Sequence, residues 1–187
     1  MRSGLNMARV GGILMIAGVA LTAILTAMAA SGQPVGLGGP SVNQWAVIAC
    51  LALLGGGAAA IGLGGAAPFD ARATRSGLGI FAVGSLSLAA SGIVAARLVS
   101  GEADPLGDLP TMVLGLGGLL VPIGVIVTGA SLLRSTGLAR VAGACLLAGP
   151  LIAIGTLAAS IPIGVALGWL LAGVGLMGVA WLAVRVS

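Results

Sequence analysis

The chain contains six separate stretches, each of about 20 residues or more, that are almost entirely apolar. A helix needs about 20 apolar residues to cross the ~30 Å hydrocarbon core of a bilayer. The stretches do not alternate between polar and apolar residues, as the strands of a membrane β-barrel do. We therefore predict an all-α polytopic membrane protein, with one domain (1–187) of six transmembrane helices at residues 10–30, 43–65, 77–98, 111–133, 138–159 and 162–184.

The composition excludes several classes of soluble protein. Charged residues make up 6% of the chain and hydrophobic residues 59%, whereas an average soluble domain is roughly 25% charged. So little polar surface cannot cover a water-soluble enzyme or support a disordered tail. The net charge of +4 comes from scattered arginines without interleaved aromatic residues, so nucleic acid is not an expected partner.

The arginines predict the orientation of the spans. Connections on one side of the bilayer hold seven of the eight arginines, and Arg97 lies near the other side together with Glu102 and Asp104. Cytoplasmic loops carry an excess of arginine and lysine. We therefore predict a plasma-membrane protein with cytoplasmic N- and C-termini, and the even number of spans agrees, since it places both termini on the same side. The seven arginines are Arg2, Arg9, Arg72, Arg75, Arg134, Arg140 and Arg185.

The first span has an alternative interpretation as a signal peptide. Arg2 and Arg9 precede it, and Ala27-Met28-Ala29 resembles a cleavage site with small residues. However, its apolar run of about 20 residues exceeds the usual signal core of about 7–15 residues. We therefore expect the span to be retained, with N-terminal sequencing as the test.

A spacing of nine residues from an arginine to a glycine occurs in three of the spans. The pairs are Arg9 and Gly18, Arg75 and Gly84, and Arg140 and Gly149. The arginines are 66 and 65 residues apart, which suggests three parallel two-helix hairpins. In the even spans we align Gly124 with Gly173. The alternative is chance similarity among spans that are rich in small residues.

The sixth span carries small residues at helical spacing. Lipid gives no hydrophobic drive for helices to associate, so close backbone approach at small residues supplies the packing. We expect this face to pack inside the bundle, and a surface for a partner subunit is the alternative. The face consists of Gly164, Gly168, Ala172 and Gly175.

Two prolines interrupt the fourth and fifth spans. Each removes a backbone hydrogen bond and tends to kink its helix. Paired Gly/Pro interruptions are a pointer to the binding site of a transporter, although simple curvature of a packed helix is the other interpretation. We expect any cavity or hinge to lie beside Gly118, Pro122, Gly149 and Pro150.

Arg97 is the one charge near the outer end of a span. It lies about 20 residues, or roughly 30 Å, from the inner end of that span. At that depth its guanidinium can reach the outer interface, where Glu102 or Asp104 could pair with it. We expect an anchor here, with a polar site for an anionic headgroup or solute as the alternative.

The spans lack the groups on which most membrane chemistry relies. The chain contains no histidine or lysine, and no aspartate or glutamate lies near the centre of a span. Proton relays and ion-coupled carriers use such groups. We therefore predict no catalytic residue, no cofactor and no metal. Cys50 and Cys145 fall in opposite halves of the bilayer, so we also expect them to form no disulfide.

Three features together resemble a broad group of uncharacterised bacterial six-span integral membrane proteins. They are the small-residue first span that begins at an arginine, the outer loop ADPLGDLP at 103–110, and an arginine soon after the last span. Several such proteins place a histidine after the loop, and this chain has none. The resemblance implies a membrane protein without an assigned activity.

These observations favour a non-enzymatic structural or accessory membrane subunit that acts by helix packing. Its partners would be the lipid bilayer and either another membrane protein or further copies of the chain. The alternative is a transport component, such as the substrate-binding membrane subunit of a modular importer, for a small and weakly polar solute. A transporter needs a cavity of a few hundred Å³ with some polar lining, whereas a packing subunit is filled.

Overall fold

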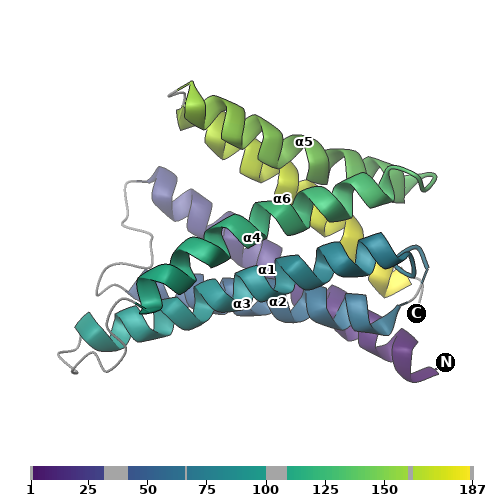
Figure 1. Cartoon of the computed structure of the whole chain (residues 1–187), viewed down its shortest axis with the longest axis horizontal. Coiled ribbons are helices and arrows are strands. Elements are labelled where there is room, and N and C mark those ends of the chain that lie inside the picture. Colours follow the sequence, from purple (N-terminus) through teal and green to yellow (C-terminus); the bar gives the residue numbers. More distant parts are fainter. Residues whose placement is uncertain (1, 32–41, 66, 100–108, 160–161, 186–187) are drawn as a thin grey trace.

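The computed structural model describes residues 2–31, 42–65, 67–99, 109–159 and 162–185 (Figure 1). These residues form six helices and no strand, which confirms the predicted fold class. All six are long and apolar enough to cross a membrane, with mean hydropathies of 2.0 to 2.2 over the apolar windows. The chain is therefore a multi-pass membrane protein. The helices are α1 (Arg2–Ala30), α2 (Val42–Gly64), α3 (Arg72–Val99), α4 (Leu109–Leu132), α5 (Leu138–Ala158) and α6 (Pro162–Arg185).

The bounds of the helices agree with the predicted spans to within two residues, except at the starts of α1 and α3. There the helix begins eight and five residues earlier, at Arg2 and Arg72. The spans were defined by apolar residues, but a helix does not stop where the hydrocarbon stops. Its backbone hydrogen bonds continue into the interface, where arginine side chains are hydrated.

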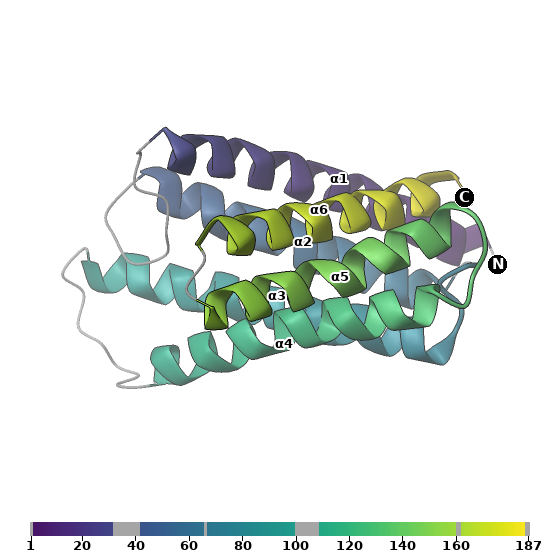
Figure 2. The same ribbon diagram turned by 90° about the horizontal axis from the view of Figure 1, so that it is seen from above.

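Both chain termini lie at the same end of the bundle, with the connections after α2 and after α4 (Figures 1 and 2). We call this the terminal end, and the opposite end the distal end. Gly65 follows α2 with φ +59°, and its N–H donates to the carbonyl of Ile61 at 3.2 Å. Gly137 precedes α5 with φ +61°. Both connections thus use a glycine with a positive φ, which glycine adopts without steric strain.

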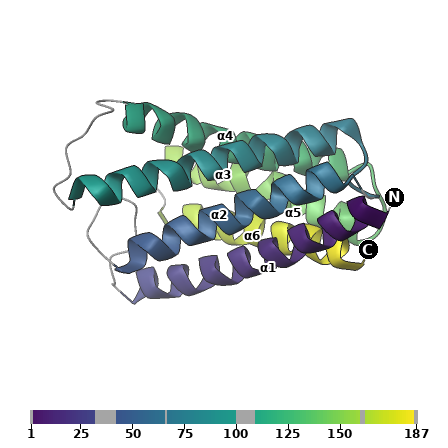
Figure 3. The same ribbon diagram turned by 90° about the horizontal axis from the view of Figure 1, so that it is seen from below.

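The helices form a closed ring of three hairpins. Each helix packs against its neighbours in the chain, and α6 packs against α1. Figure 3 shows α2 lying between α1 and α3. The hairpins are therefore α1–α2, α3–α4 and α5–α6, each beginning and ending at the terminal end.

The same contact recurs inside each hairpin, at the glycine nine residues after the arginine. A Cβ at this glycine would lie within about 3 Å of a backbone nitrogen of the even helix, so the two backbones touch at this level. The distances are 3.1 Å from Gly18 to Leu54, 2.8 Å from Gly84 to Val121 and 2.7 Å from Gly149 to Ala172.

A second contact joins each hairpin to the next and also recurs three times. It pairs Gly62 with Leu78, Gly129 with Gly143, and Ala180 with Gly12. The last pair closes the ring between α6 and α1, with 2.7 Å from a Cβ at Gly12 to the carbonyl oxygen of Ala180. The three hairpins therefore occupy equivalent places around the bundle axis, in a pseudo-threefold arrangement.

The structure corrects the predicted alignment of the even helices. Gly124 packs on Phe81, and its equivalent, Gly175, packs on Leu146. A Cβ on Gly173, the predicted match, would meet nothing within 4 Å. A shift of two residues turns a helical position by about 200°, so the predicted alignment matched an inward glycine with an outward one.

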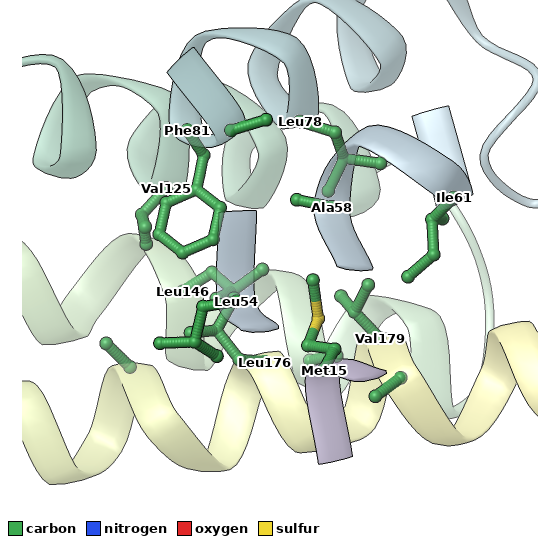
Figure 4. Packing of buried hydrophobic residues seen from close by; sticks show 14 of the residues in the cluster. Met15, Leu54, Ala58, Ile61, Leu78, Phe81, Val125, Leu146, Leu176 and Val179 are labelled. Atoms are coloured by element: carbon green, nitrogen blue, oxygen red, sulfur yellow. The ribbon is translucent and has the colours of Figure 1, made fainter. Parts of the chain in front are cut away.

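Large side chains from all three hairpins fill the centre of the ring. Met15, Phe81 and Leu146 stand at equivalent positions, six residues after the respective arginine, and are 0%, 3% and 0% exposed. Figure 4 shows them meeting Leu54 and Leu176 in the interior. At this level the bundle axis is occupied by packed side chains.

Candidate functional site

The predicted small-residue face of α6 lies against α5. Gly168 packs on Ala153, and the Ala172 backbone packs on Gly149. Gly175 packs on Leu146 one turn further along. This part of the face therefore joins two helices of the same chain. Gly164 lies within α6, outside the residues whose side-chain surroundings are described.

The four residues named for a cavity or hinge face different surroundings. Both helices continue through their prolines, Pro122 in α4 and Pro150 in α5. Gly118 faces outward, and a Cβ there would meet nothing within 4 Å. Gly149 and Pro150 are buried, with Gly149 in the contact between α5 and α6. The structure thus does not bring the four together around one space.

The predicted outer polar site is described only in part. Arg97 is exposed in the last turn of α3, at the distal end. Glu102 and Asp104 lie outside the described residues.

The two cysteines are free, as predicted. Cys50 of α2 is buried, with its Sγ 3.0 Å from the Thr22 Oγ1 and 3.4 Å from the Gly18 carbonyl oxygen of α1. Cys145 lies on α5 and is half-buried. In the other two hairpins the equivalent position is a glycine, Gly117 or Gly168, which packs against Gly84 or Gly149. The Cys50 thiol takes this place in the first hairpin.

Every charged side chain that the structure describes is exposed, that is, uncovered by other parts of the protein. Inside the bundle the polar side chains are mainly hydroxyls. Thr128 donates a hydrogen bond to the carbonyl of Gly124, and Ser91 to that of Ser87. Both hydrogen bonds therefore lie within a single helix. Gln44 donates across to the Gly92 carbonyl and links α2 to α3 near the distal end.

Two of these hydroxyls join α3 to α4 at the terminal end. Ser131 Oγ donates to the carbonyl of Thr128 at 2.8 Å. It lies 2.8 Å from Thr74 Oγ1, and a hydroxyl has one proton to give. Thr74 must therefore be the donor in this pair. The two side chains hold the start of α3 against the end of α4.

A groove of about 500 Å³ opens beside this pair, between the start of α3 and the last turns of α4. We call it the terminal groove. Asp70 and Arg134 form its charged rim, whereas Ile126, Val127 and Ala130 line its apolar part. From Arg134 to Ile126 the groove follows α4 for about 12 Å. It therefore reaches from the charged end of the bundle into the level of the hydrocarbon.

The groove is not apparent from the sequence. There Arg134 is one of several arginines that indicate topology, and Asp70 is an isolated acidic residue. Asp70 is the one acidic residue in the arginine-rich connections, which was a signal. The hydroxyls of Thr74 and Ser131, where the first hairpin has Ala8 and Gly64, were another. Recognising the second signal requires the alignment of the even helices that the structure provided.

No protein-family model, curated protein or solved structure matches this chain. Its function must therefore be inferred from the residues and their arrangement.

Proposed function

We propose that this chain is a non-enzymatic membrane subunit that acts by helix packing, as a rigid partner for lipid and for other membrane proteins. The observation that carries the proposal is the filled, closed ring. Met15, Phe81 and Leu146 meet in the interior, and α6 seals against α1 through Gly12. A body built in this way offers a stiff outer surface.

The distribution of charge supports the same role. The described arginines and Asp70 all lie on the outside of the bundle. A solute that crosses a membrane needs polar groups along its path. Two of the interior hydroxyls, those of Thr128 and Ser91, donate to carbonyls of their own helices. This arrangement favours the packing subunit over the transport component.

The orientation belongs to the proposal. The terminal end holds the arginine-rich connections and both termini, and by the positive-inside rule it faces the cytoplasm of a plasma membrane. Cysteines that replace Ser76 at the terminal end or Gly101 in the predicted outer loop, each in a chain whose Cys50 and Cys145 are changed to alanine, test this. A membrane-impermeant thiol reagent labels the Gly101→Cys variant in intact cells, and the Ser76→Cys variant only after permeabilisation. The reverse pattern refutes the orientation.

The role itself is tested by native mass spectrometry of the full chain, extracted in a mild detergent. A packing subunit is recovered with a protein partner, or with further copies of itself, in fixed stoichiometry. The matched measurement is release of small polar and apolar solutes from vesicles that contain the purified chain. Release faster than from protein-free vesicles, together with recovery as a lone monomer, refutes the packing role and supports transport.

A further inference from the structure

The pseudo-threefold arrangement supplies an internal comparison for the terminal groove. In the first hairpin the equivalent of Ser131 is Gly64, and the equivalent of Thr74 is Ala8. A Cβ on Gly64 would lie 2.9 Å from the Ala8 nitrogen and 2.7 Å from the Gly4 carbonyl oxygen. The first hairpin is thus closed by backbone contact at the level where the second hairpin has hydroxyls and an adjoining groove.

The charges of the groove are not used within the described part of the protein. Neither the Arg134 guanidinium nor the Asp70 carboxylate forms a hydrogen bond or ion pair with another described residue. The third hairpin differs, because Arg185, the equivalent of Arg134, lies 4.8 Å from the ring centre of Trp181. Arg134 and Asp70 are therefore available to a ligand.

The start of α3 adds a further feature. The N–H of Arg75 is the first to pair along the helix, with the carbonyl of Ala71. The preceding N–H groups, including those of Ala73 and Thr74 in the groove wall, have no acceptor within the helix. A helix N-terminus also carries a partial positive charge. With Arg134, it supplies positive charge for a phosphate, whereas Asp70 supplies negative charge for a cation.

We infer that the terminal groove binds a membrane phospholipid whose headgroup carries both a phosphate and a primary amine, of the phosphatidylethanolamine class. Arg134 and the start of α3 take the phosphate, and Asp70 takes the ammonium group. An acyl chain lies along Ile126, Val127 and Ala130. The groove follows α4 for about 12 Å, a length that suits a headgroup together with the first part of an acyl chain. Phe69 in the preceding turn is fully buried and holds this wall in place.

The test uses the full chain in nanodiscs or mild detergent, with native mass spectrometry to count retained lipids. Phosphatidylethanolamine, phosphatidylglycerol and phosphatidylcholine with identical acyl chains are supplied as an equimolar mixture. We expect phosphatidylethanolamine to be retained in preference to the other two. An exposed pair of opposite charges contributes up to about fivefold to binding, so Arg134→Gln should lower its occupancy by up to about fivefold. Asp70→Asn should remove the preference over phosphatidylglycerol.

Matched variants separate the groove from general effects at the interface. Arg140 is also an exposed arginine at the terminal end but lies outside the groove lining, so Arg140→Gln should leave occupancy unchanged. Ala130 is exposed in the apolar part of the groove, and Ala130→Phe should block the acyl chain. Ala144→Phe on the exposed face of α5 is its control. Thermal unfolding of each variant verifies that the bundle is intact.

Three outcomes overturn the inference. Equal retention of all three lipids, unaffected by Arg134→Gln, indicates annular lipid only. A preference for phosphatidylglycerol that depends on Arg134 but not on Asp70 indicates an anionic lipid instead. Displacement of the lipid by equimolar free phosphoethanolamine indicates a soluble ligand, since the apolar part of the groove then contributes nothing.

Discussion

The first and second hairpins share their interior but differ at the terminal end. Inside the bundle, Gly18 matches Gly84, and Met15 matches Phe81, in the same contacts. At the terminal end Gly64 touches the backbone of Ala8, whereas Ser131 accepts a hydrogen bond from Thr74. The repeated contacts are those that close the ring. The two hairpins differ at the terminal end, where the groove opens beside the second hairpin. The groove lies outside the repeated contacts that close the ring.

The glycine contacts that recur in the hairpins hold the helices together, whereas the terminal groove occurs beside the second hairpin and offers side chains that can bind a ligand. Backbone contact at Gly64 leaves no room for a side chain between the two helices of the first hairpin at this level. The hydroxyl pair of the second hairpin joins α3 to α4 through side chains instead. The exposed charges of Asp70 and Arg134 then lie beside an apolar wall.

The largest expected effect comes from giving the first hairpin the residue of the second. Gly64→Ser places a Cβ 2.7 Å from the Gly4 carbonyl oxygen, and the backbones must separate. We expect a loss of about 3 kcal/mol in the free energy of unfolding, measured by denaturant titration in detergent micelles. Gly56→Ser on the same helix is the control, because a Cβ at Gly56 meets nothing within 4 Å. Equal stability of the two variants would contradict the closed contact.

Truncating the shared interior should affect both hairpins alike. The helices of the unfolded protein stay in an apolar environment. The loss of stability is therefore set by the cavity that the truncated side chain leaves, rather than by transfer of that side chain to water. Phe81→Ala and Met15→Ala should each lower the free energy of unfolding by about 2 kcal/mol. Val83→Ala and Ile13→Ala, at exposed positions of the same helices, should change it little. A large effect in only one hairpin would break the equivalence.

The hydroxyl pair of the second hairpin should contribute less. Thr74→Val removes the proton that Thr74 donates to Ser131. Such bonds between membrane helices average about 0.6 kcal/mol, and a double-mutant cycle with Ser131→Ala measures the coupling. Thr156→Val is the matched control, since Thr156 donates to the carbonyl of Ile152 in its own helix. No coupling between Thr74 and Ser131 would remove the distinction between the two hairpins.

The smallest expected effect distinguishes the second and third hairpins. Arg185→Gln removes a cation–π contact with Trp181, which at an exposed site is worth about 0.5 kcal/mol. Arg134→Gln should leave the unfolding free energy of the lipid-free protein unchanged, because Arg134 has no partner among the described residues. Equal losses in the two variants would mean that Arg134 also serves the fold.

The apolar stretches allowed the number of helices and most of their bounds to be predicted, because each stretch can be compared with the thickness of a bilayer. The starts of α1 and α3 were missed, since there the helix continues past the apolar run. The arginine-to-glycine spacing suggested the three hairpins, and the structure shows that Gly18, Gly84 and Gly149 make the same contact in each. The alignment of Gly124 with Gly173 was wrong. A helix rich in glycine has small residues on several faces, so its composition does not reveal which face is inward.

The sequence alone thus determined that this chain lies in a membrane as six helices, because the cost of an unpaired backbone in lipid leaves few alternatives. Only the tertiary structure decided which face of each helix meets which neighbour, and hence the threefold repetition of contacts. It also decided that Asp70, Thr74 and Arg134 line one groove. These residues lie up to 64 positions apart in the chain, and they meet because α3 and α4 pack in one particular register.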